Sequence, residues 1–584
     1  MNILSQHNYS AILLINIFAT ITLSFVVFTW VYIIEKPISK RFVVLIFSCL
    51  PLLSMLRMGT YESGDLTFQA YKLYSFYTNL AAGHWIPRWS AELNATYGYP
   101  NFIFTYHLPY YIASLFHAIG FHLVDSVKLT LATTYLLSGI LFYEWIRRHT
   151  SGKAALVGAL LYQFAPYRFV TMHFRATLGE STALMILPLC ALCIYVFIEK
   201  RSYVSEISVS VSLALLILSH QAMSLLGIPF LFLYCIFLAS SRPKPSYLYA
   251  LRPFVIGLLL SAYYWVPIIA ESRYTLQSHA TVIVQHFPTL QFLFSTWKYG
   301  FLFQGPRGEL SPALGYLHWI AIGVALLYIL KSKATPVLMF LVFIFSVYFL
   351  SAQSFSPTWQ LFPILHKIQF SYRFVGILVF VSSAIAAVLV HIHMKSITRH
   401  KIFVFLFFSI LFSTSILNWA NRKVIPYAPQ KDFIAFAPYI TEKGEGFDPA
   451  IPLLADPKHP WKSVLPKEHI FGKREEIAIT HEVRTHTSHL YTIETPISNQ
   501  LVENTYYFPG WEVYVDNVQN PINPAGTPNT GLITFDVPEG KHSIRLIFSD
   551  TPVRRFSYLI SLATACLLIC YPILKHRKRA HPVY

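Results

Sequence analysis

Apolar residues gather in thirteen runs along the chain, and each run is long enough, or nearly so, to cross a bilayer as a helix. A spanning helix needs about 20 predominantly apolar residues, because each residue advances the helix by only about 1.5 Å. We therefore expect an α-helical polytopic membrane protein with about 13 transmembrane helices. The runs lie at about residues 11–34, 42–57, 124–146, 154–170, 180–198, 204–219, 222–240, 249–269, 314–331, 335–351, 374–392, 401–418 and 556–575.

Two long polar segments, 58–123 and 419–555, separate some of these runs. The second segment is rich in proline and contains stretches in which apolar and polar residues alternate, as in a half-buried strand. Trp511–Asp516 and His542–Phe548 are two such stretches, and Val537–Gly540 between them predicts a hairpin turn. We therefore expect a small antiparallel β-sandwich. The predicted domains are a transmembrane domain at 1–418 that includes the loop 58–123, a β-rich domain at 419–555, and a final transmembrane helix with a basic tail at 556–584.

The composition excludes a soluble globule, because 55% of the residues are hydrophobic and only 12% are charged, whereas ordinary soluble domains carry about 25% charged residues. The formal net charge is +18. Its positive residues are scattered between apolar runs and form no single basic surface, so we expect no nucleic-acid partner. The lipid bilayer is the expected environment.

The distribution of Lys and Arg fixes an orientation, because cytoplasmic loops of membrane proteins are enriched in these residues. With the N-terminus outside, seven short cytoplasmic segments hold 20 of the 45 Lys and Arg residues, and the C-terminus lies inside. The two long polar segments are then extracytoplasmic. The basic residues are Lys36, Lys40, Arg41, Arg147, Arg148, Lys153, Lys200, Arg201, Arg242, Lys244, Arg252, Lys331, Lys333, Lys395, Arg399, Lys401, Lys575, Arg577, Lys578 and Arg579.

The first external loop, 58–123, combines carboxylates, an arginine and many aromatic residues. Asp65 could accept a proton from a hydroxyl nucleophile, and Arg88 could neutralise a phosphate at the level of the lipid headgroups. Glu62, three residues before Asp65, is close enough on a helical turn to share a proton or a cation with it, or is simply solvated. An aromatic interface belt with a solvated acid would show the same pattern. The aromatic candidates for stacking on a sugar or gripping an isoprenoid chain are Trp89, Tyr97 and Tyr99.

Further ionisable residues lie near the predicted external ends of the fourth and fifth apolar runs. Charges this close to hydrocarbon are costly unless they pair or face a cavity, so they are candidates for substrate binding. Arg175 and Glu180 fit a binding site and a purely structural ion pair equally well. The candidates in this group are Arg168, His173, Arg175 and Glu180.

Two more candidates stand at predicted outer ends of spans. His220 is a candidate for substrate binding, although a hydrogen-bonded core histidine is the commoner use of such a residue. Arg373 precedes the run 374–392, where its guanidinium could bind a lipid phosphate. Ordinary contact with headgroups is the alternative.

The sequence contains no paired-histidine motif, Walker loop or dinucleotide fingerprint. No cofactor is therefore predicted with certainty, and a divalent cation would have to use Glu62 and Asp65 together with water.

Six stretches of the chain carry a resemblance to known proteins. They are Ser63–Gly120, Phe174–Glu180, Leu218–Gln221, Tyr263–Pro267, Ile368–Phe374 and Tyr507–Asp516. These stretches resemble a family of bacterial membrane proteins labelled "6-pyruvoyl-tetrahydropterin synthase-related", and also the YfhO-like proteins, and both look like members of the GT-C glycosyltransferase superfamily. The matches run along nearly the whole chain in the expected order, which makes them more specific together than singly. The chain departs from the family pattern at three places, since the family commonly has histidines where Gly64 and Gln69 stand and Pro-Trp in place of Ser371–Tyr372.

The resemblance implies a membrane glycosyltransferase in which the first-loop acid, here Asp65, is the catalytic or acceptor-binding carboxylate. It implies a sugar on a polyprenyl phosphate as donor, and a glycan, lipid or protein acceptor outside the bacterial cytoplasmic membrane. Two other classes stay open. A lipid-linked glycan transporter or flippase would use the same arginines without Asp65 as a base, and a non-catalytic envelope assembly protein would use the β-domain to recruit partners.

Overall fold

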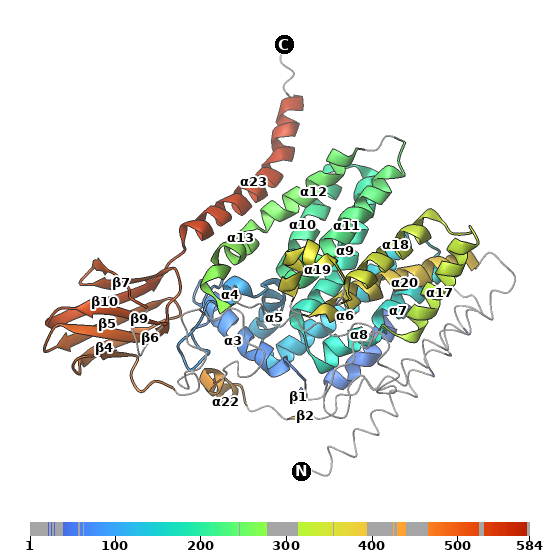
Figure 1. Ribbon diagram of the computed structural model, residues 1–584. Helices are drawn as coiled ribbons and strands as arrows, with labels where there is room; N and C mark the ends of the chain where they lie inside the picture. Colours follow the sequence, from blue (N-terminus) through green and yellow to red (C-terminus); the bar gives the residue numbers. More distant parts are fainter. Residues whose placement is uncertain are drawn as a thin grey trace, which may run out of the picture. The chain divides into compact units, whose positions relative to one another are not determined.

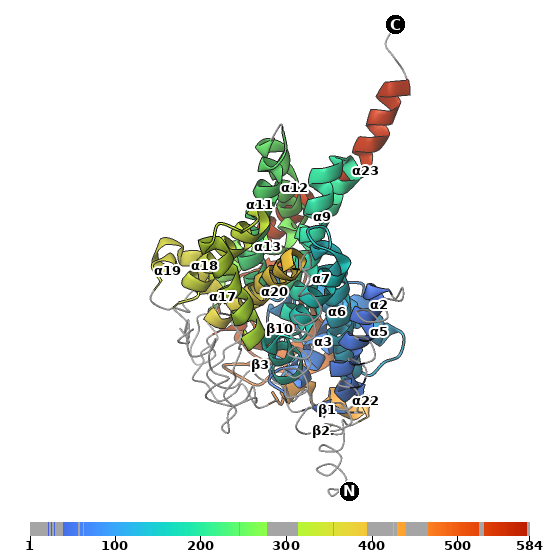
Figure 2. The same ribbon diagram turned by 90° about the vertical axis from the view of Figure 1, so that its right-hand side faces the viewer.

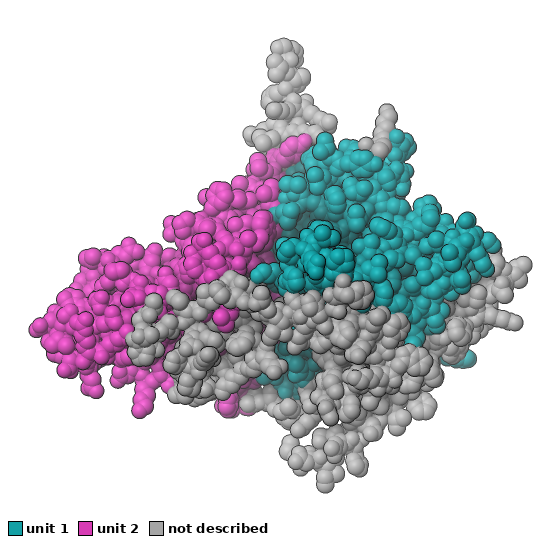
Figure 3. Space-filling model, viewed as in Figure 1, with its two compact units in different colours: residues 1–67, 124–258, 283–427 teal, residues 68–123, 259–282, 428–584 magenta. Residues whose placement is uncertain are grey.

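The apolar runs form helices whose ends lie close to those expected from the sequence. The computed structural model describes residues 39–56, 59–61, 63–243, 246–276, 314–353, 356–368, 370–393, 424–425, 429–439, 465–524 and 531–580, with single positions at 22, 25, 29 and 452. The predicted runs at 11–34 and 401–418 fall almost wholly outside these residues, as do Glu62 and the predicted boundary at 418. Figure 1 shows the elements, and Figure 3 colours the two compact units into which the chain divides.

The first unit comprises residues 1–67, 124–258 and 283–427 and is helical. Its most buried helix is α20, in which every residue from Phe374 to Val390 is buried. Helices α7, α17 and α18 pack around α20 (Figures 1 and 2). The long helices of this unit are α2 (Lys40–Cys49), α6 (Leu123–Ile146), α7 (Gly152–Gln163), α9 (Leu178–Lys200), α10 (Tyr203–Ser219), α11 (Gln221–Ser240), α12 (Tyr247–Leu260), α17 (Tyr316–Leu330), α18 (Pro336–Ser351) and α20 (Phe374–His393).

Short helical pieces complete this unit, and β1 (Thr60–Tyr61) pairs with β2 (Val424–Ile425) in an antiparallel bridge. The short pieces are η2 (Leu50–Leu56), α8 (Pro166–Phe169), η3 (Val170–Phe174), α19 (Thr358–Leu361), η5 (Pro363–Ile368) and η6 (Ser371–Arg373).

Two predicted runs are broken rather than continuous helices. The run 154–170 divides into α7, which ends at Gln163, and α8, which begins at Pro166. Proline has no N–H and disfavours helical geometry at the residue before it, and Ala165 is indeed extended, with φ −64° and ψ 138°. The run 249–269 divides into α12 and α13 (Ala262–Glu271). Hydropathy alone does not detect such breaks.

Within the described residues, five helices are long and apolar enough to cross a membrane, or six if α12 and the helical stretch after it form one bent span. Three shorter apolar helices, α10, α17 and α18, have 10–17 residues. The chain is therefore a helical membrane protein.

The second unit comprises residues 68–123, 259–282 and 428–584 and contains a β domain. One antiparallel sheet has the order β4-β5-β10-β7-β8, and a second has the order β3-β6-β9 (Figure 1). The strands are β3 (Ile470–Gly472), β4 (Ala478–Arg484), β5 (Ser488–Thr495), β6 (Asn499–Tyr506), β7 (Trp511–Val515), β8 (Val518–Asn520), β9 (Leu532–Val537) and β10 (Gly540–Phe548). The helical elements are α3 (Leu66–Ala81, mostly in this unit), α4 (Asn101–Phe104), α5 (Leu108–Ala118), α13, η4 (Ser272–Tyr274), α22 (Gln430–Ala435), η7 (Ala437–Tyr439) and α23 (Pro552–Ala580).

The predicted strands at Trp511–Asp516 and His542–Phe548 are confirmed as β7 and β10, which pair with each other. The predicted hairpin at Val537–Gly540 is wrong. These residues connect β9 to β10, and the two strands belong to different sheets, because β9 pairs with β6 and β10 pairs with β5. Alternation shows which residues of a strand are buried, but it does not identify the strand's partner.

A buried polar network joins the two sheets. The Glu503 carboxylate on β6 lies 2.9 Å from His489 Nδ1 and 3.3 Å from Arg484 Nη2, and it accepts a 2.9 Å hydrogen bond from the Tyr491 hydroxyl. Burial alone would raise the pKa of Glu503, but His489 and Arg484 hold it at about 2. The charged carboxylate therefore stabilises the packing of the sheets.

We expect the β domain to lose stability as the pH falls from about 4.5, the ordinary pKa of glutamate, towards 2. The unfolded chain takes up the Glu503 proton first, so the stabilisation is complete above pH 4.5 and fades below it, by up to about 3 kcal/mol. Thermal unfolding of the full-length protein in detergent, followed by tryptophan emission, measures this dependence. In the Glu503→Gln variant, stability should change much less over this pH range. If the pH dependence is the same as in the wild type, Glu503 is not its cause.

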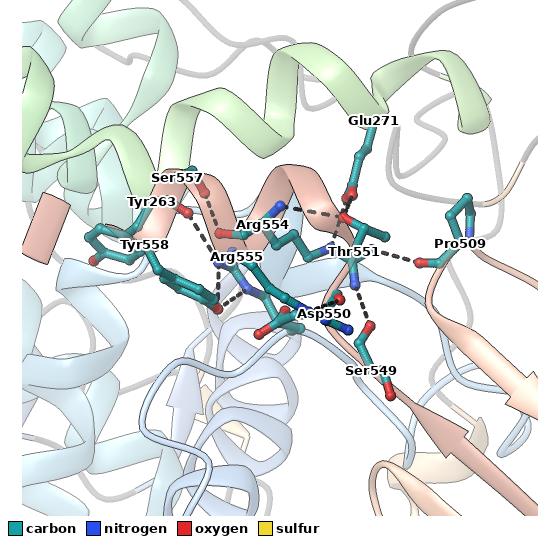
Figure 4. Close-up of polar contacts among 11 residues, drawn as sticks. Tyr263, Glu271, Pro509, Ser549, Asp550, Thr551, Arg554, Arg555, Ser557 and Tyr558 are labelled. Atoms are coloured by element: carbon teal, nitrogen blue, oxygen red, sulfur yellow. Dashed lines mark hydrogen bonds and ion pairs between the residues drawn. The ribbon is translucent and has the colours of Figure 1, made fainter. Parts of the chain in front are cut away.

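A second buried network ties the β domain to α13 and α23 within the same unit (Figure 4). Arg554 on α23 is 0% exposed, and its Nε donates a 3.0 Å hydrogen bond to Glu271 at the end of α13. Its Nη1 and Nη2 donate to the Ser549 and Pro509 carbonyls, which flank β10 and β7. The Thr551 hydroxyl donates to the other Glu271 oxygen at 2.6 Å.

We expect Glu271→Gln to destabilise the protein by about 3–5 kcal/mol, because it leaves the Arg554 charge buried without a counter-ion. The double variant Glu271→Leu/Arg554→Met should recover much of the loss, since neither charge then remains. Thermal unfolding of the three purified proteins checks this, with Glu512→Gln as the control carboxylate. A double variant less stable than Glu271→Gln would refute this charge-balance explanation.

Candidate functional site

The candidate site of the first unit is built around the loop that follows α8. This loop makes one π-helical turn at η3, and Ala176 then adopts the left-handed conformation with φ +52°. The Gly64 and Asp65 N–H groups donate to the Phe174 and Arg175 carbonyls at 2.8 and 3.0 Å. These bonds hold the Asp65 backbone against the loop that carries Arg175.

The Arg175 guanidinium is balanced by a fully buried carboxylate. Its Nη1 lies 2.9 Å from Glu180 Oε2, and Glu180 is 0% exposed. The Tyr167 hydroxyl donates to the other Glu180 oxygen. The guanidinium also stacks on the Tyr372 ring, 4.7 Å from its centroid. A buried charge needs such a partner, so this pair, which the sequence left open, is formed.

Asp65 lies at the edge of this cluster and is half-buried. Its carboxylate is near enough to interact electrostatically with both Arg175 and Tyr372. The arrangement thus places a partly accessible carboxylate beside a guanidinium and a phenol. Such a group can accept a proton while a neighbouring cation offsets negative charge.

His220 and Arg373 belong to the same cluster. His220 caps α11, since its Nδ1 accepts a 3.2 Å hydrogen bond from the Met223 N–H, so its proton is on Nε2. Both Arg373 and Arg175 act on His220 electrostatically. Arg373 Nη1 donates a 2.5 Å hydrogen bond to the Ile368 carbonyl, and its guanidinium covers the Phe370 ring. The structure therefore brings together Asp65, Arg175, Glu180, His220 and Arg373.

Arg168 makes different contacts, although it was predicted beside Arg175. Its Nη2 donates to Ser138 Oγ at 2.5 Å, and the guanidinium stacks between Tyr135 and Tyr162. Arg168 is 2% exposed, and no carboxylate lies within ion-pair distance of it among the residues described. It forms a second polar cluster with Gln163 at the break between α7 and α8.

His173, between Arg168 and Arg175 in the loop, is buried. Its ring stacks on Phe169, with the centroids 6.2 Å apart, and lies 6.4 Å from the Tyr61 ring. Both partners belong to the same unit, so His173 takes part in the packing of the loop.

The remaining predicted loop residues belong to the second unit. Trp89, Tyr97 and Tyr99 are all buried. Trp89 packs edge-on against Trp511 of β7, and Tyr97 packs on Tyr506 of β6, while Tyr99 bridges to Ser90. These contacts attach the loop to the β domain. Arg88 is buried in the same unit and donates hydrogen bonds to the Tyr263 carbonyl and the Tyr558 hydroxyl. Glu62 lies outside the described residues.

Sequence reasoning missed Tyr167 and Tyr372, both of which contact the Arg175–Glu180 pair. Tyr372 stands at a departure from the family pattern and directly precedes Arg373, which is the signal that could have identified it. Tyr167 likewise directly precedes a candidate arginine, Arg168, so the same signal was present there.

Among the described residues, no group of three or more His, Cys, Asp or Glu side chains could hold a metal ion. The predicted cation at Glu62 and Asp65 stays a prediction, because Glu62 lies outside these residues.

The family described as "6-pyruvoyl-tetrahydropterin synthase related domain; membrane protein" matches residues 104–421. A curated relative, an uncharacterized protein of Lactococcus lactis subsp. cremoris (strain MG1363), is 25% identical over 186 residues, which are 31% of this chain and 30% of that protein.

Similar solved structures include the arabinofuranosyltransferase AftD from mycobacteria, with 15% identity, a TM-score of 0.44, and coverage of 67% of this chain and 27% of that one. The Archaeoglobus fulgidus oligosaccharyltransferase has 12% identity, a TM-score of 0.41, and coverage of 67% and 54%. ArnT from Cupriavidus metallidurans bound to undecaprenyl phosphate has 12% identity, a TM-score of 0.36, and coverage of 68% and 76%. The chain thus spans under a third of the curated relative and of AftD, and these TM-scores are too low to establish a shared fold.

We expect Glu180→Gln to lower the stability of the protein by about 3–5 kcal/mol, because Arg175 would remain buried without its counter-ion. Thermal unfolding in detergent, compared with the exposed control Glu199→Gln, measures the loss. If the Glu180→Gln variant is as stable as the control, the Arg175–Glu180 ion pair does not contribute to the stability of the protein.

Proposed function

Because the chain belongs to the family of membrane proteins described as the 6-pyruvoyl-tetrahydropterin synthase related domain, we propose that it is a GT-C-type membrane glycosyltransferase. It transfers a sugar from a polyprenyl-phosphate donor to a glycan, lipid or protein acceptor on the outer side of the bacterial cytoplasmic membrane. The observation that carries this proposal is the position of Asp65, a half-buried carboxylate fixed by its backbone against the loop of Arg175.

The proposed reaction is a direct displacement at the anomeric carbon. The acceptor oxygen forms a bond to this carbon as the bond to the phosphate oxygen breaks, and the acceptor's proton passes to the Asp65 carboxylate. The leaving group is the polyprenyl phosphate, whose negative charge an arginine stabilises. Arg88, Arg175 and Arg373 are the candidates for that role, and Glu62 could share a proton or a divalent cation with Asp65.

The proposed topology follows the charge distribution of the sequence. It has about 13 spans, with the N-terminus outside and the C-terminus in the cytoplasm. The β domain is then extracytoplasmic, where it would bind an acceptor glycan or cap the site. The contacts of Arg554 with Glu271 and with the carbonyls beside β7 and β10 support a fixed attachment of this domain to α23.

A transporter for a lipid-linked glycan is the second candidate, and one observation favours it. Transporters of many kinds bind substrate at discontinuous helices, where polar groups are tolerated at membrane depth. The break between α7 and α8 carries the buried Arg168 with Ser138 and Gln163. A transporter would need this cluster and not the base Asp65.

We expect Asp65→Asn to lower sugar transfer by about 10²–10⁴-fold, because a general base contributes that much, while expression and membrane insertion stay normal. The measurement is the glycan composition of a deletion strain complemented with each variant, with the exposed Asp536→Asn as the control. Loss of one sugar from the glycan supports the transferase. Retained glycosylation in Asp65→Asn would refute it, and loss of whole-polymer export in the deletion strain would favour the transporter.

A further inference from the structure

Arg88 is a buried cation whose charge has no acidic partner in the second unit as described. Its side chain is 6% exposed. Nη2 donates to the Tyr263 carbonyl at 3.0 Å and to the Tyr558 hydroxyl at 2.8 Å, and Nε donates to the same hydroxyl at 3.1 Å. Nη1 is buried and makes no hydrogen bond to any described residue. Figure 4 shows Tyr263 and Tyr558, from α13 and α23, next to each other.

The neighbouring charges do not balance Arg88. Arg554 is a second buried cation that acts on it electrostatically, and Glu271 is already bound to Arg554 at 3.0 Å. Asp550 is half-buried and acts on Arg554 and Tyr558, but it forms no ion pair with Arg88 among the described contacts. Burying an uncompensated guanidinium is costly, so an anion at Nη1 would be strongly favoured.

His107 supplies the complementary acceptor beside Arg88. It is 0% exposed, and its Nε2 lies 2.6 Å from the Phe102 carbonyl oxygen. A carbonyl oxygen only accepts, so Nε2 carries the proton and Nδ1 presents a lone pair. Nδ1 is buried and has no hydrogen-bond partner in the described part of the chain. Burial, and then Arg88, lower the pKa of His107 to about 3, so the ring is neutral at physiological pH.

We propose that Arg88 and His107 form a binding site for a phosphomonoester in its singly protonated form. Arg88 Nη1–H donates to a phosphate oxygen, and the P–OH group donates to His107 Nδ1. The groups that face the site are Tyr111 from α5, Tyr263 and Tyr264 from α13, and Tyr558 from α23, together with Arg554 beyond them.

The proposal rests on the proposed function only for the source of the phosphate. Transfer of a sugar from a polyprenyl-phosphate donor releases a polyprenyl phosphomonoester as a dianion, which takes up a proton from water to form the required P–OH group because its second pKa is about 6. Among the arginines considered, Arg175 is already neutralised by Glu180 at 2.9 Å, whereas Arg88 keeps a buried donor for the ligand. Of these two arginines, Arg88 is therefore the one suited to bind a phosphomonoester.

Binding of farnesyl phosphate to the purified full-length protein in nanodiscs tests this, with inorganic phosphate and farnesol as comparison probes. We expect farnesyl phosphate to bind more tightly at pH 6 than at pH 8, because the second pKa of a phosphomonoester is about 6. Farnesol should bind weakly and without pH dependence. If farnesyl phosphate binds much more tightly than inorganic phosphate, the ligand is a lipid phosphate. If the two affinities are similar, the site binds the phosphate group alone. Both results support the anion site.

Two variants separate the roles of the residues. Arg88→Gln should weaken farnesyl phosphate binding by at least about tenfold, because a buried charge partner is lost. His107→Gln keeps a donor for the Phe102 carbonyl but removes the Nδ1 acceptor, so it should abolish the preference for pH 6. The control is Arg273→Gln, an exposed arginine of the same unit.

Thermal unfolding of each variant shows whether it is folded. If Arg88→Gln does not fold, the pH dependence of farnesyl phosphate binding to His107→Gln tests the proposed site by itself. Wild-type binding that is equal for farnesol and farnesyl phosphate, or a pH preference unchanged in His107→Gln, would overturn the proposal. These binding measurements do not require sugar transfer. Retained glycosylation in Asp65→Asn would therefore refute the proposed transferase function but not the proposed phosphate site.

Discussion

The stability of this fold depends on whether each buried charged side chain has a group of opposite charge, or enough hydrogen-bond acceptors, beside it. Moving an ion out of water costs several kcal/mol even after the protein relaxes, so a buried cation persists only beside a carboxylate or a dense set of acceptors. Arg175 has Glu180, and Arg554 has Glu271 and two carbonyls. Each pair joins segments distant in the sequence or on either side of a helix break, so charge balance fixes the tertiary structure at both places.

The same constraint distinguishes structural arginines from those suited to a ligand. Arg175 and Arg554 are neutralised within the protein, and their removal is expected to disturb folding first. Arg88 and Arg168 are as deeply buried, but their contacts are hydroxyls, amide or carbonyl oxygens and aromatic rings. Arginine remains charged at every physiological pH, so these two sites each retain a positive charge that an anionic substrate group can offset.

Breaks between helices make the polar sites possible within apolar runs. The break before Pro166 separates α7 from α8 and carries the Arg168 cluster. The helical stretch that begins at Pro166 ends after the π-helical turn η3, and the Phe174 and Arg175 carbonyls at this end accept the Gly64 and Asp65 N–H groups. A helix that continued past this point would have used those carbonyls internally. The catalytic proposal for Asp65 depends on this second break, whereas the alternative of a transporter with Arg168 depends on the first.

The sequence by itself determined the membrane class, the approximate limits of the described helices and two strands of the β domain. These follow from hydropathy and alternation, which depend only on whether neighbouring residues along the chain are buried. It also singled out Asp65, Arg175 and Glu180 as candidates. The tertiary structure decided that Arg175 pairs with Glu180, that Arg168 belongs to another cluster, and that Trp89 and Tyr97 attach the loop to the β domain. It also decided the sheet partners of β9 and β10, and that His107 Nδ1 has no hydrogen-bond partner among the described residues. Partners of this kind are set by contacts between residues far apart in the chain, and local periodicity carries no information about them.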